Sequence, residues 1–370
     1  MTTLVLIFSH LLTYYVMGQC PAPHGWTGDR MGTRVRVGVA LLGAVMSAAA
    51  AVCLFRPREW HTTAPAMGTH ATVTLVGTPR DKMAGKMGRL SAAALNEISA
   101  VERLMSIYKP ESDVGRLNRS ASGEELAIDV RTFEALNAAI ESSRLTAGAF
   151  NIFVLPAELL WGFKTGRARR VPPPEKVEIT AGDGSDISLR VADGRHFAGF
   201  LKEGMKIDLG GIAAGYAVDR AIKVLKEMNA RGALVDIGGD CYCLGTSARG
   251  TPWRVGIRHP RREGLLTVLE LSDRAVATSG DYEDFFVEGG KRYSHIFDPR
   301  TGRPAESGVI SATVISSSCT AADALSTAMV VMGKDEGLRL VRGLPSTECI
   351  LVTEEPGRLS VIRSSDKTGH

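Results

Sequence analysis

Nineteen consecutive residues without a charged side chain, Val37 to Phe55, constrain this chain more than any other feature. At a rise of 1.5 Å per residue, a helix of this length just crosses the hydrocarbon core of a bilayer. Arginines flank the run, with Arg34 and Arg36 before it and Arg56 after it. The run therefore predicts a transmembrane or signal segment, followed by a separate folded body.

The flanking charges predict an orientation for this segment. Basic residues favour the cytoplasmic side of a membrane span. The arginines before the run outnumber those after it once Glu59 is counted against Arg56 and Arg58. We expect an uncleaved anchor in the inner membrane, with the N-terminus inside and the body on the periplasmic, extracytoplasmic side. Cleavage after the alanine-rich stretch 48–51 and lipid modification of Cys53 are alternatives.

The anchor also sets the expected domain boundary. We assign residues 1–60 to the membrane anchor or signal region and residues 61–370 to one folded domain. Met31, followed by arginines and the apolar run, is typical of the start of a membrane-targeted chain. Residues 1–30 are therefore expected to carry no function.

Composition excludes several classes of protein. The chain has 44 Lys and Arg against 40 Asp and Glu, a formal net charge of +4, and no long basic block. We therefore expect no nucleic-acid partner. The six cysteines are scattered without the spacing of a disulfide framework. Cys241 and Cys243 lie two apart in an expected strand, and we interpret them as ordinary buried cysteines rather than metal ligands.

The hydrophobic pattern mixes hairpins with helices and lacks regular βαβ alternation, which indicates an α+β fold with mixed or antiparallel sheets and packed helices. Helical spacing predicts helices over 83–105, 130–145, 216–228 and 320–332. Alternation predicts strands over 71–76, 187–191, 197–205, 233–237, 267–271, 284–287, 291–297, 349–352 and 359–362. Gly289 and Gly290 predict a hairpin turn, and Gly232 is expected to end the third helix.

One glycine-rich segment, residues 207–217, is read as a hydrophobic strand leading through Gly210 and Gly211 directly into a helix. Glycines let the backbone approach a ligand, and a helix N-terminus favours an anion such as phosphate. The segment matches neither a Walker loop nor GxGxxG. An ordinary tight turn capped by Asp208 explains the pattern equally well.

A second segment, residues 318–327, places Asp323 and Thr327 four apart on one helix face. Both side chains offer the hard oxygen donors that Mg²⁺ accepts. The competing interpretation is a capping box, in which Thr320 and Asp323 cap the helix and bind no metal.

Two further segments place aromatic and titratable side chains at the ends of expected elements. His295 precedes a turn, and its ordinary pKa suits proton transfer from a hydroxyl, although a lone histidine is more often structural. Tyr108 follows a helix that ends before Pro110, so its ring could serve as a stacking platform or pack into the core.

Six collinear motifs make the body resemble the ApbE-type FAD:protein FMN transferases, from about Met67 to Gly333. The motifs are MGT at 67–69, MSIYKPESDVGRLN at 105–118, DLGGIAAGYAVDR at 208–220, ATSGDY at 277–282, YSHIFDPRTG at 293–302 and ADALSTA at 322–328. The resemblance implies a Mg²⁺-dependent enzyme. It would move FMN from FAD to a Thr or Ser hydroxyl of a redox protein and release AMP.

The resemblance also implies roles for particular residues. It makes His295 the candidate base and Asp323 a catalytic residue. The metal ligands that it implies are Gly211, Asp323 and Thr327. The FAD contacts that it implies are Met67, Tyr108, Ala149, Phe150, Asn151, Asp208, Ala214, His295 and Ile296, with Tyr108 stacked on the isoalloxazine.

Two segments depart from the family pattern. The family usually has an acidic residue and then threonine where this chain has Asn151 and Phe153, and it commonly has lysine where this chain has Ala214. Loss of one charge-assisted phosphate contact weakens binding by about 1.5–3 kcal/mol. Two alternatives to the transferase therefore stay open: an FAD pyrophosphatase that yields FMN and AMP, and a flavin-binding protein without catalysis.

Overall fold

The computed structural model describes residues 29–165, 168–173, 176–177, 182–355 and 358–366. The expectation for residues 1–30 thus falls almost wholly outside the described part. The chain divides into two compact units, one comprising Met1–Arg58 with Thr78–Ala84, the other Glu59–Gly77 with Gly85–His370. The boundary at residue 60 stays a prediction.

The first unit contains the apolar helix predicted around residues 37–55. Helix α2 spans Asp29–Phe55, and its segment Gly38–Phe55 is long and apolar enough to cross a membrane. Its described apolar side chains are solvent-exposed, including Leu42 at 66% and Met46 at 65%. An apolar helix is unfavourable in water unless something such as lipid covers it. A membrane, as predicted from the sequence, would provide that cover.

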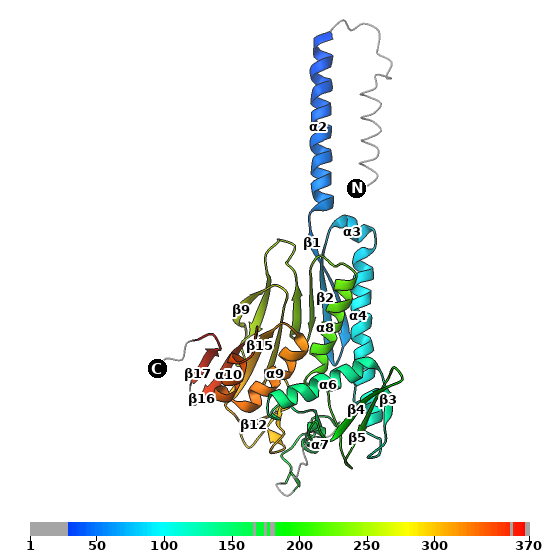
Figure 1. Ribbon diagram of the computed structural model, residues 1–370. Helices are drawn as coiled ribbons and strands as arrows, with labels where there is room; N and C mark the ends of the chain where they lie inside the picture. Colours follow the sequence, from blue (N-terminus) through cyan, green and yellow to red (C-terminus); the bar gives the residue numbers. More distant parts are fainter. Residues whose placement is uncertain (1–28, 166–167, 174–175, 178–181, 356–357, 367–370) are drawn as a thin grey trace. The chain divides into compact units, whose positions relative to one another are not determined.

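The second unit holds the other elements, apart from the short helix α3 (Pro79–Met83) of the first (Figure 1). Its helices are α4 (Lys86–Met105), α5 (Asp113–Leu117), α6 (Val130–Leu145), η1 (Ile152–Val154), α7 (Leu155–Trp161), α8 (Ala213–Glu227), α9 (Cys319–Met332) and α10 (Lys334–Arg342). Its strands are β1 (Arg58–Ala66), β2 (Thr69–Gly77), β3 (Leu126–Ile128), β4 (Ile187–Ala192), β5 (Arg195–Phe200), β6 (Ala233–Ile237), β7 (Asp240–Leu244), β8 (Trp253–Arg258), β9 (Leu265–Leu271), β10 (Arg274–Gly280), β11 (Phe285–Glu288), β12 (Lys291–Ser294), β13 (Phe297–Asp298), β14 (Arg303–Pro304), β15 (Val309–Ser316), β16 (Glu348–Glu355) and β17 (Arg358–Arg363).

An eight-stranded sheet in the order β1-β2-β6-β7-β10-β15-β16-β17 forms the centre of the second unit. Its pairings from β2 to β17 are antiparallel. Smaller sheets are β3-β5-β4, β8-β9, β11-β12 and β13-β14. This antiparallel sheet with packed helices confirms the α+β prediction.

Alternation along the strands gives the sheet two different faces. In β10, Ala275 and Ala277 belong to the main core, in which α4, α8 and α9 pack on the sheet, whereas Val276 belongs to a second cluster under β8 and β9. Cys241 and Cys243 are buried in that second cluster, which confirms their interpretation as core residues. Helices thus cover one face of the sheet and a β-ribbon covers the other (Figure 1).

Several predicted elements are confirmed almost to the residue. They are the helix over 130–145, the strand over 233–237, the strand β2, and the hairpins closed by Gly289-Gly290 and by β16 with β17. Gly289 and Gly290 both have positive φ, at 60° and 77°, which a two-residue hairpin turn requires.

Other boundaries were predicted wrongly. The helix over 83–105 is broken at Gly85, whose φ of +71° is not helical. The strand over 197–205 ends at Phe200. The third helix starts at Ala213 and ends at Glu227, five residues before Gly232, because Asn229 takes a positive φ of 55°.

The predicted strand over 291–297 is interrupted at two residues that bear on function. Strand β12 ends at Ser294 and β13 starts at Phe297, so His295 and Ile296 lie between two short ladders. The backbone of His295 is nevertheless fixed, because its N–H donates to the carbonyl of Asp284 at 2.9 Å. The break leaves this residue outside a regular sheet and beside a cavity.

Candidate functional site

A cavity of about 200 Å³ in the second unit is the candidate site. Nine of the twelve site residues expected from the sequence line it. They are Ala149, Phe150, Asn151, Asp208, Gly211, His295, Ile296, Asp323 and Thr327. These residues come from four distant stretches of the chain, so their convergence is a result of the fold.

Three expected site residues do not line this cavity: Met67, Tyr108 and Ala214. Met67 has a positive φ of 51°, and its backbone N–H donates to Glu102 at 3.0 Å. Ala214 is half-buried against the main core. Tyr108 is 69% exposed, so the alternative that it packs into the core is wrong.

The loop before α8 is held by a side chain from the 105–118 motif. Asn118 donates to the carbonyl of Ile207 and accepts from its N–H, both at 2.8 Å. The N–H of Asp208 donates to the carbonyl of Ile152 at 2.8 Å. Residues 205–209 are neither helix nor strand, so the predicted strand before the glycine pair is wrong. These bonds fix Asp208 at the cavity without a strand.

Asp208 is not the cap of α8. That helix begins after Ile212, which makes no side-chain cap, while Asp208 Oδ1 accepts from the N–H of Gly210 at 2.9 Å. Its other oxygen, Oδ2, lies 2.8 Å from Nζ of Lys164. The carboxylate is therefore oriented toward a cation in the cavity.

Lys164 forms a compact charge cluster with two carboxyl groups. Its Nζ lies 3.6 Å from Oε1 of Glu158 in addition to the contact with Asp208. Burial and the charge of Asp208 raise the pKa of Glu158 well above its ordinary value. Burial alone would lower the pKa of Lys164, but the charges of Asp208 and Glu158 raise it. The cluster thus keeps the lysine charged and favours a protonated Glu158.

Close contact between α8 and α9 places Asp323 at the cavity. A Cβ at Gly215 would lie 2.4 Å from the carbonyl oxygen of Cys319, so only glycine allows this approach. The N–H of Gly215 donates to Oδ2 of Asp323 at 3.0 Å. Asp219 of α8 accepts from the N–H groups of Cys319 and Thr320, both at 2.9 Å. The glycine and the aspartate therefore dock α8 against the start of α9.

The capping-box interpretation of Thr320 and Asp323 is wrong. The N-cap of α9 is Ser318, whose side chain accepts from the N–H of Ala321, and the Thr320 hydroxyl donates to Asp219. Asp323 is therefore not needed as a cap, and its carboxylate faces the cavity together with Thr327.

The donor set expected for Mg²⁺ fits the chemistry of that ion. Gly211 and Thr327 are neighbours, since a Cβ at Gly211 would lie 3.6 Å from Oγ1 of Thr327. The Ser279 hydroxyl forms a hydrogen bond with that of Thr327, and the two oxygens are 3.0 Å apart. Asp323 adds a buried carboxylate. All three expected ligand groups are oxygens, the donors that Mg²⁺ prefers.

Two carboxyl groups at this site are destabilised as anions. Burial raises the pKa of Asp323 to about 7, and burial together with the charge of Asp323 raises the pKa of Asp240. A divalent cation would favour the ionised forms of both. Among the described residues, no three His, Cys, Asp or Glu side chains form a metal cluster. The expected set contains only one such side chain, Asp323, and is completed by a hydroxyl and a carbonyl oxygen.

His295 meets the requirements of a base. Its Nδ1 lies 3.1 Å from the carbonyl oxygen of Asp284, and a carbonyl only accepts, so Nδ1 carries the proton and Nε2 has a free lone pair. Burial lowers the pKa of His295 below 6.5. The imidazole is therefore neutral at pH 7 and able to accept a proton.

Comparisons with known proteins agree with this arrangement. The model of the ApbE family matches residues 67–351. The chain belongs to the ApbE family. The FAD:protein FMN transferase of Vibrio cholerae is 31% identical over 310 residues, covering 83% of this chain and 91% of that protein. The FAD:protein FMN transferase of Haemophilus influenzae is 33% identical over 255 residues, covering 67% of this chain and 73% of that protein.

Solved structures of ApbE proteins share the fold. The flavin transferase ApbE from Vibrio cholerae matches with a TM-score of 0.73 at 29% identity, covering 84% of this chain and 98% of that one. The ApbE protein from Thermotoga maritima matches with a TM-score of 0.71 at 34% identity, covering 82% and 96% respectively.

The departures of this ApbE-family chain from the usual pattern have different structural consequences. Asn151 lines the cavity and bonds its own loop, because Oδ1 accepts from the N–H of Phe153 and Nδ2 donates to the carbonyl of Gly182, both at 2.9 Å. Phe153 is buried in the core against Phe200. Asn151 thus bears on the site, whereas Phe153 serves packing.

Sequence reasoning missed several polar residues of the cavity. They are Glu158, Lys164, Asp240, Thr278, Ser279 and Glu283. Lys164 is the only Lys or Arg among the described residues that line this cavity. It follows Trp161-Gly162-Phe163, outside every quoted motif, so nothing in its local pattern pointed to the site. Ser279 and Thr278 lie inside the ATSGDY motif, which was a signal that could have been used.

Proposed function

We propose that this chain transfers FMN from FAD to a hydroxyl of an acceptor protein. The convergence of His295, Asp323 and Thr327 on one cavity carries the proposal. Relatives named FAD:protein FMN transferases, aligned over most of the chain, support it. The reaction joins the acceptor oxygen to the FMN phosphorus, breaks the bond to the AMP phosphate and releases AMP.

The base in this proposal is His295. Its Nε2 takes the proton of a Thr or Ser hydroxyl as the oxygen attacks phosphorus, while the Nδ1–H bond to Asp284 keeps the ring in place. Asp323, Thr327 and the Gly211 carbonyl would hold Mg²⁺, which when bound neutralises the charge of the pyrophosphate and the leaving AMP.

The remaining assigned residues bind the flavin nucleotide in this proposal. Phe150, Asn151 and Ile296 line the cavity with Asp208. Tyr108 presents an exposed ring for stacking on the isoalloxazine. Ala149 belongs with the lining, and Met67 and Ala214 are assigned by family resemblance alone. Lys164 adds a cation to the cavity, whereas the family pattern has its lysine at the position of Ala214.

Apolar α2 anchors the enzyme in this proposal. The helix would hold the second unit at an inner membrane, on the extracytoplasmic side, where a redox subunit with an exposed hydroxyl would be within reach. The acceptor would be such a subunit.

The decisive experiment uses the full chain in detergent with FAD, Mg²⁺ and a panel of redox subunits. Mass spectrometry would detect a covalent FMN adduct, and chromatography would detect AMP. We expect both products, and loss of both with a chelator or with Asp323→Ala. Exposed Asp193→Asn, on the β4–β5 turn, is the matched control.

The same experiment separates the alternatives. AMP and free FMN without an adduct, on subunits that a known transferase modifies, would indicate a pyrophosphatase. Intact FAD with neither product would indicate a flavin-binding protein without catalysis.

A further inference from the structure

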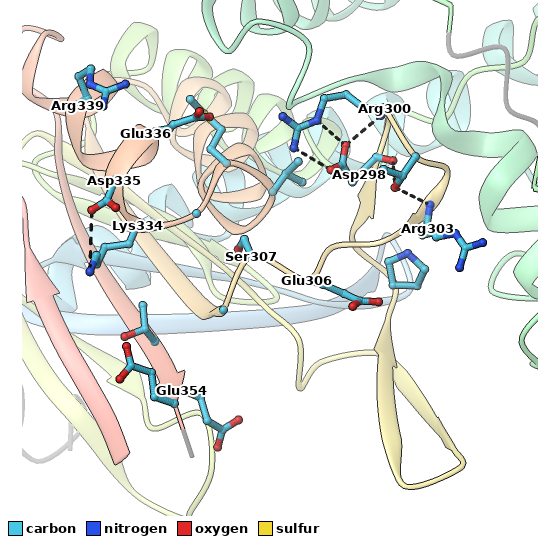
Figure 2. A pocket seen from close by; sticks show the side chains of 18 of the residues that line it. Asp298, Arg300, Arg303, Glu306, Ser307, Lys334, Asp335, Glu336, Arg339 and Glu354 are labelled. Atoms are coloured by element: carbon cyan, nitrogen blue, oxygen red, sulfur yellow. Dashed lines mark hydrogen bonds and ion pairs between the residues drawn. The ribbon is translucent and has the colours of Figure 1, made fainter. Parts of the chain in front are cut away.

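A cavity of about 1030 Å³ on the surface of the second unit is lined by charged side chains of both signs (Figure 2). The lining holds six Asp or Glu and five Lys or Arg residues, so its charge favours no particular ligand. Some of these residues pair with one another, as Arg300 does with Asp298 at 2.8 Å. A different ion pair, between Arg169 and Asp284, lies outside the lining of this cavity and of the candidate site, yet Asp284 contacts His295.

Asp284 holds the candidate base through its backbone. Its carbonyl accepts from the backbone N–H of His295 at 2.9 Å and from Nδ1 of the same residue at 3.1 Å. One carbonyl group thus fixes both the position of the ring and the tautomer in which Nε2 is free. Asp284 lies just before β11 and outside its ladder. Contacts of the Asp284 side chain therefore bear directly on where this carbonyl points.

Arg169 binds that side chain with both branches of its guanidinium. Nη1 contacts Oδ1 of Asp284, and Nη2 donates to Oδ2 at 3.2 Å. Nη1 also donates to the carbonyl of Phe285 at 3.4 Å. Two parallel bonds fix the orientation of a carboxylate as well as its distance. Arg169 thus restrains residues 284 and 285 together, from a position 115 residues before Asp284 in the chain.

Arg169 is itself held by neighbours in its own segment. Its guanidinium carbon lies 4.9 Å from the ring centroid of Phe163, which is buried and packs edge-on against Phe297. Two residues further along, the N–H of Val171 donates to Oε2 of Glu288 in β11 at 3.2 Å. An ion pair near the surface usually contributes little, because ordering two long side chains costs entropy. Stacking on a buried ring reduces that cost, so this pair can hold a loop.

Several charged groups act on the imidazole of His295. Burial lowers its pKa, whereas the hydrogen bond and the charge of Asp284 raise it. The charge of Lys164 lowers this pKa, and that of Glu283 raises it. Other carboxyl groups line the same cavity: Glu158, Asp208, Asp240 and Asp323. A carboxylate left without a cation here favours the imidazolium, which cannot accept a proton.

Arginines offset the two carboxylates that raise the pKa of His295. Nη1 of Arg258 lies 3.3 Å from Oε1 of Glu283, and Arg258 is exposed. Arg169 is half-buried and contacts both oxygens of Asp284. Arg169 can therefore act on the imidazole in two ways, through the position of the carbonyl and through the charge of the carboxylate.

We propose that Arg169 is a positioning residue for His295. It holds Asp284 so that the carbonyl of this residue keeps the Nδ1–H bond and leaves Nε2 free. It also offsets the Asp284 carboxylate, so that the imidazole stays ready to accept a proton. This inference rests on the proposed function, because it concerns the base of that reaction.

A titration tests the effect on the imidazole without requiring transfer. The full chain in detergent carries ¹³C at Cε1 of its histidines, NMR follows each signal with pH, and His295→Gln assigns the signal. We expect Arg169→Gln to raise the pKa of His295 and Asp284→Asn to lower it. Arg169→Lys keeps the charge and should leave the pKa near the wild-type value. The double variant Arg169→Gln with Asp284→Asn should do so too, because neither charge of the pair remains.

Kinetics test the effect on position. With FAD, Mg²⁺ and an acceptor subunit, kcat is measured above the pH midpoint, where protonation of His295 no longer limits the rate. Arg169→Gln should lower kcat about tenfold, because the ring loses its fixed orientation. KM for FAD should not change, because Arg169 does not line the candidate site. Arg169→Lys should restore only part of kcat, since an ammonium group lacks the fork of a guanidinium.

The matched control is Arg190→Gln. Arg190 of β4 contacts both oxygens of Glu125, and its guanidinium carbon lies 4.7 Å from the ring centroid of Phe197. This pair has the same chemistry as that of Arg169 but lies outside both cavities. The control should leave the pKa of His295 and kcat unchanged. Thermal unfolding of each variant separates a general loss of stability from the expected effects.

The outcomes separate this inference from the proposed function. FMN adducts with an unchanged pKa of His295 in Arg169→Gln, or a loss of kcat that Arg190→Gln reproduces, would overturn the positioning role and leave transfer standing. A higher KM for FAD with unchanged kcat would overturn it too, because Arg169 would then bind substrate. The expected pKa changes without an FMN adduct from the wild-type chain on any redox subunit would support the hold of Arg169 on His295 and overturn the proposed transfer.

Discussion

Lys164 is the residue on which the charge balance of the candidate site depends. Five Asp and Glu residues line the cavity, and Lys164 is the one Lys or Arg among its described lining. FAD brings a pyrophosphate with further negative charge. We therefore expect Lys164→Gln to weaken FAD binding about 10- to 150-fold, the cost of one charge-assisted contact. Quenching of flavin fluorescence, with and without Mg²⁺, measures the dissociation constant.

The control for this variant is Lys202→Gln, which removes an exposed lysine paired with Asp186 away from the cavity. It should leave FAD binding unchanged. Wild-type affinity in Lys164→Gln would mean that Asp208 and Glu158 already satisfy the lysine and that it only stabilises the loop.

In the proposed mechanism, His295 determines the pH dependence of transfer. Proton acceptance requires neutral imidazole, and burial lowers its pKa below 6.5. The rate with acceptor should therefore rise with pH, with its midpoint below the ordinary pKa of histidine. His295→Gln should remove this rise and lower the rate about 10²- to 10⁴-fold. A midpoint above 6.5, or the same profile in the variant, would exclude His295 as the base.

At the scale of elements, the contact between α8 and α9 requires glycine. A Cβ at Gly215 would lie 2.4 Å from the carbonyl oxygen of Cys319 and 2.8 Å from Cβ of Asp323. Gly215→Ala should force the helices apart, destabilise the fold by about 1–3 kcal/mol and weaken Mg²⁺ binding. Urea unfolding gives the free energy, and a Mg²⁺-induced thermal shift reports the metal.

Gly88→Ala is a matched control for this variant. Gly88 lies in α4, and a Cβ there would meet nothing within 4 Å. The change should stabilise the protein by about 0.4–1 kcal/mol, because alanine restricts the unfolded chain. Destabilisation by both substitutions alike would argue against the helix-contact explanation.

Local sequence patterns predicted an element correctly where a cause within that stretch of sequence, such as a cap or a glycine pair, sets its ends. The helix over 130–145 has regular apolar spacing and Asp129 as its cap, and both ends were predicted correctly. The glycine pair of the β11–β12 hairpin was equally clear. The cap of α9 was not predicted correctly, because Asp219 and Gly215 bind the beginning of that helix from 100 residues of sequence away or more.

The candidate site shows the same division. The family resemblance supplied nine of the cavity residues, whereas Lys164 and Glu158 came from a segment with no motif. Their importance arises from Asp208, which the fold brings from more than forty residues away. A local pattern cannot predict a charge cluster of that kind. Tyr108 could be assigned to the surface only once its exposure was known.

For the whole molecule, the apolar helix α2 is the feature that predicts where the enzyme works. Its Gly38–Phe55 segment is apolar along its length, and its described side chains are exposed. The full chain should therefore remain in the membrane fraction after a carbonate wash. Leu42→Lys with Val45→Lys should release it, since each charge at a span's centre costs about 2.5–3.5 kcal/mol. Lysines at Leu359 and Val361, exposed on β17, are the matched control.

Protease treatment then tests orientation, because an anchored domain outside the cytoplasm is open to attack while the membrane is intact. Trypsin added to spheroplasts should digest the second unit and spare a cytoplasmic marker. Digestion only after lysis would place the domain inside and remove its access to extracytoplasmic acceptors. Release of the wild-type chain by carbonate, with an intact mass lacking the residues before Cys53, would instead establish cleavage of the segment. The acceptor must lie on the side that trypsin reaches, so this result also limits which redox subunits the transfer experiment should include.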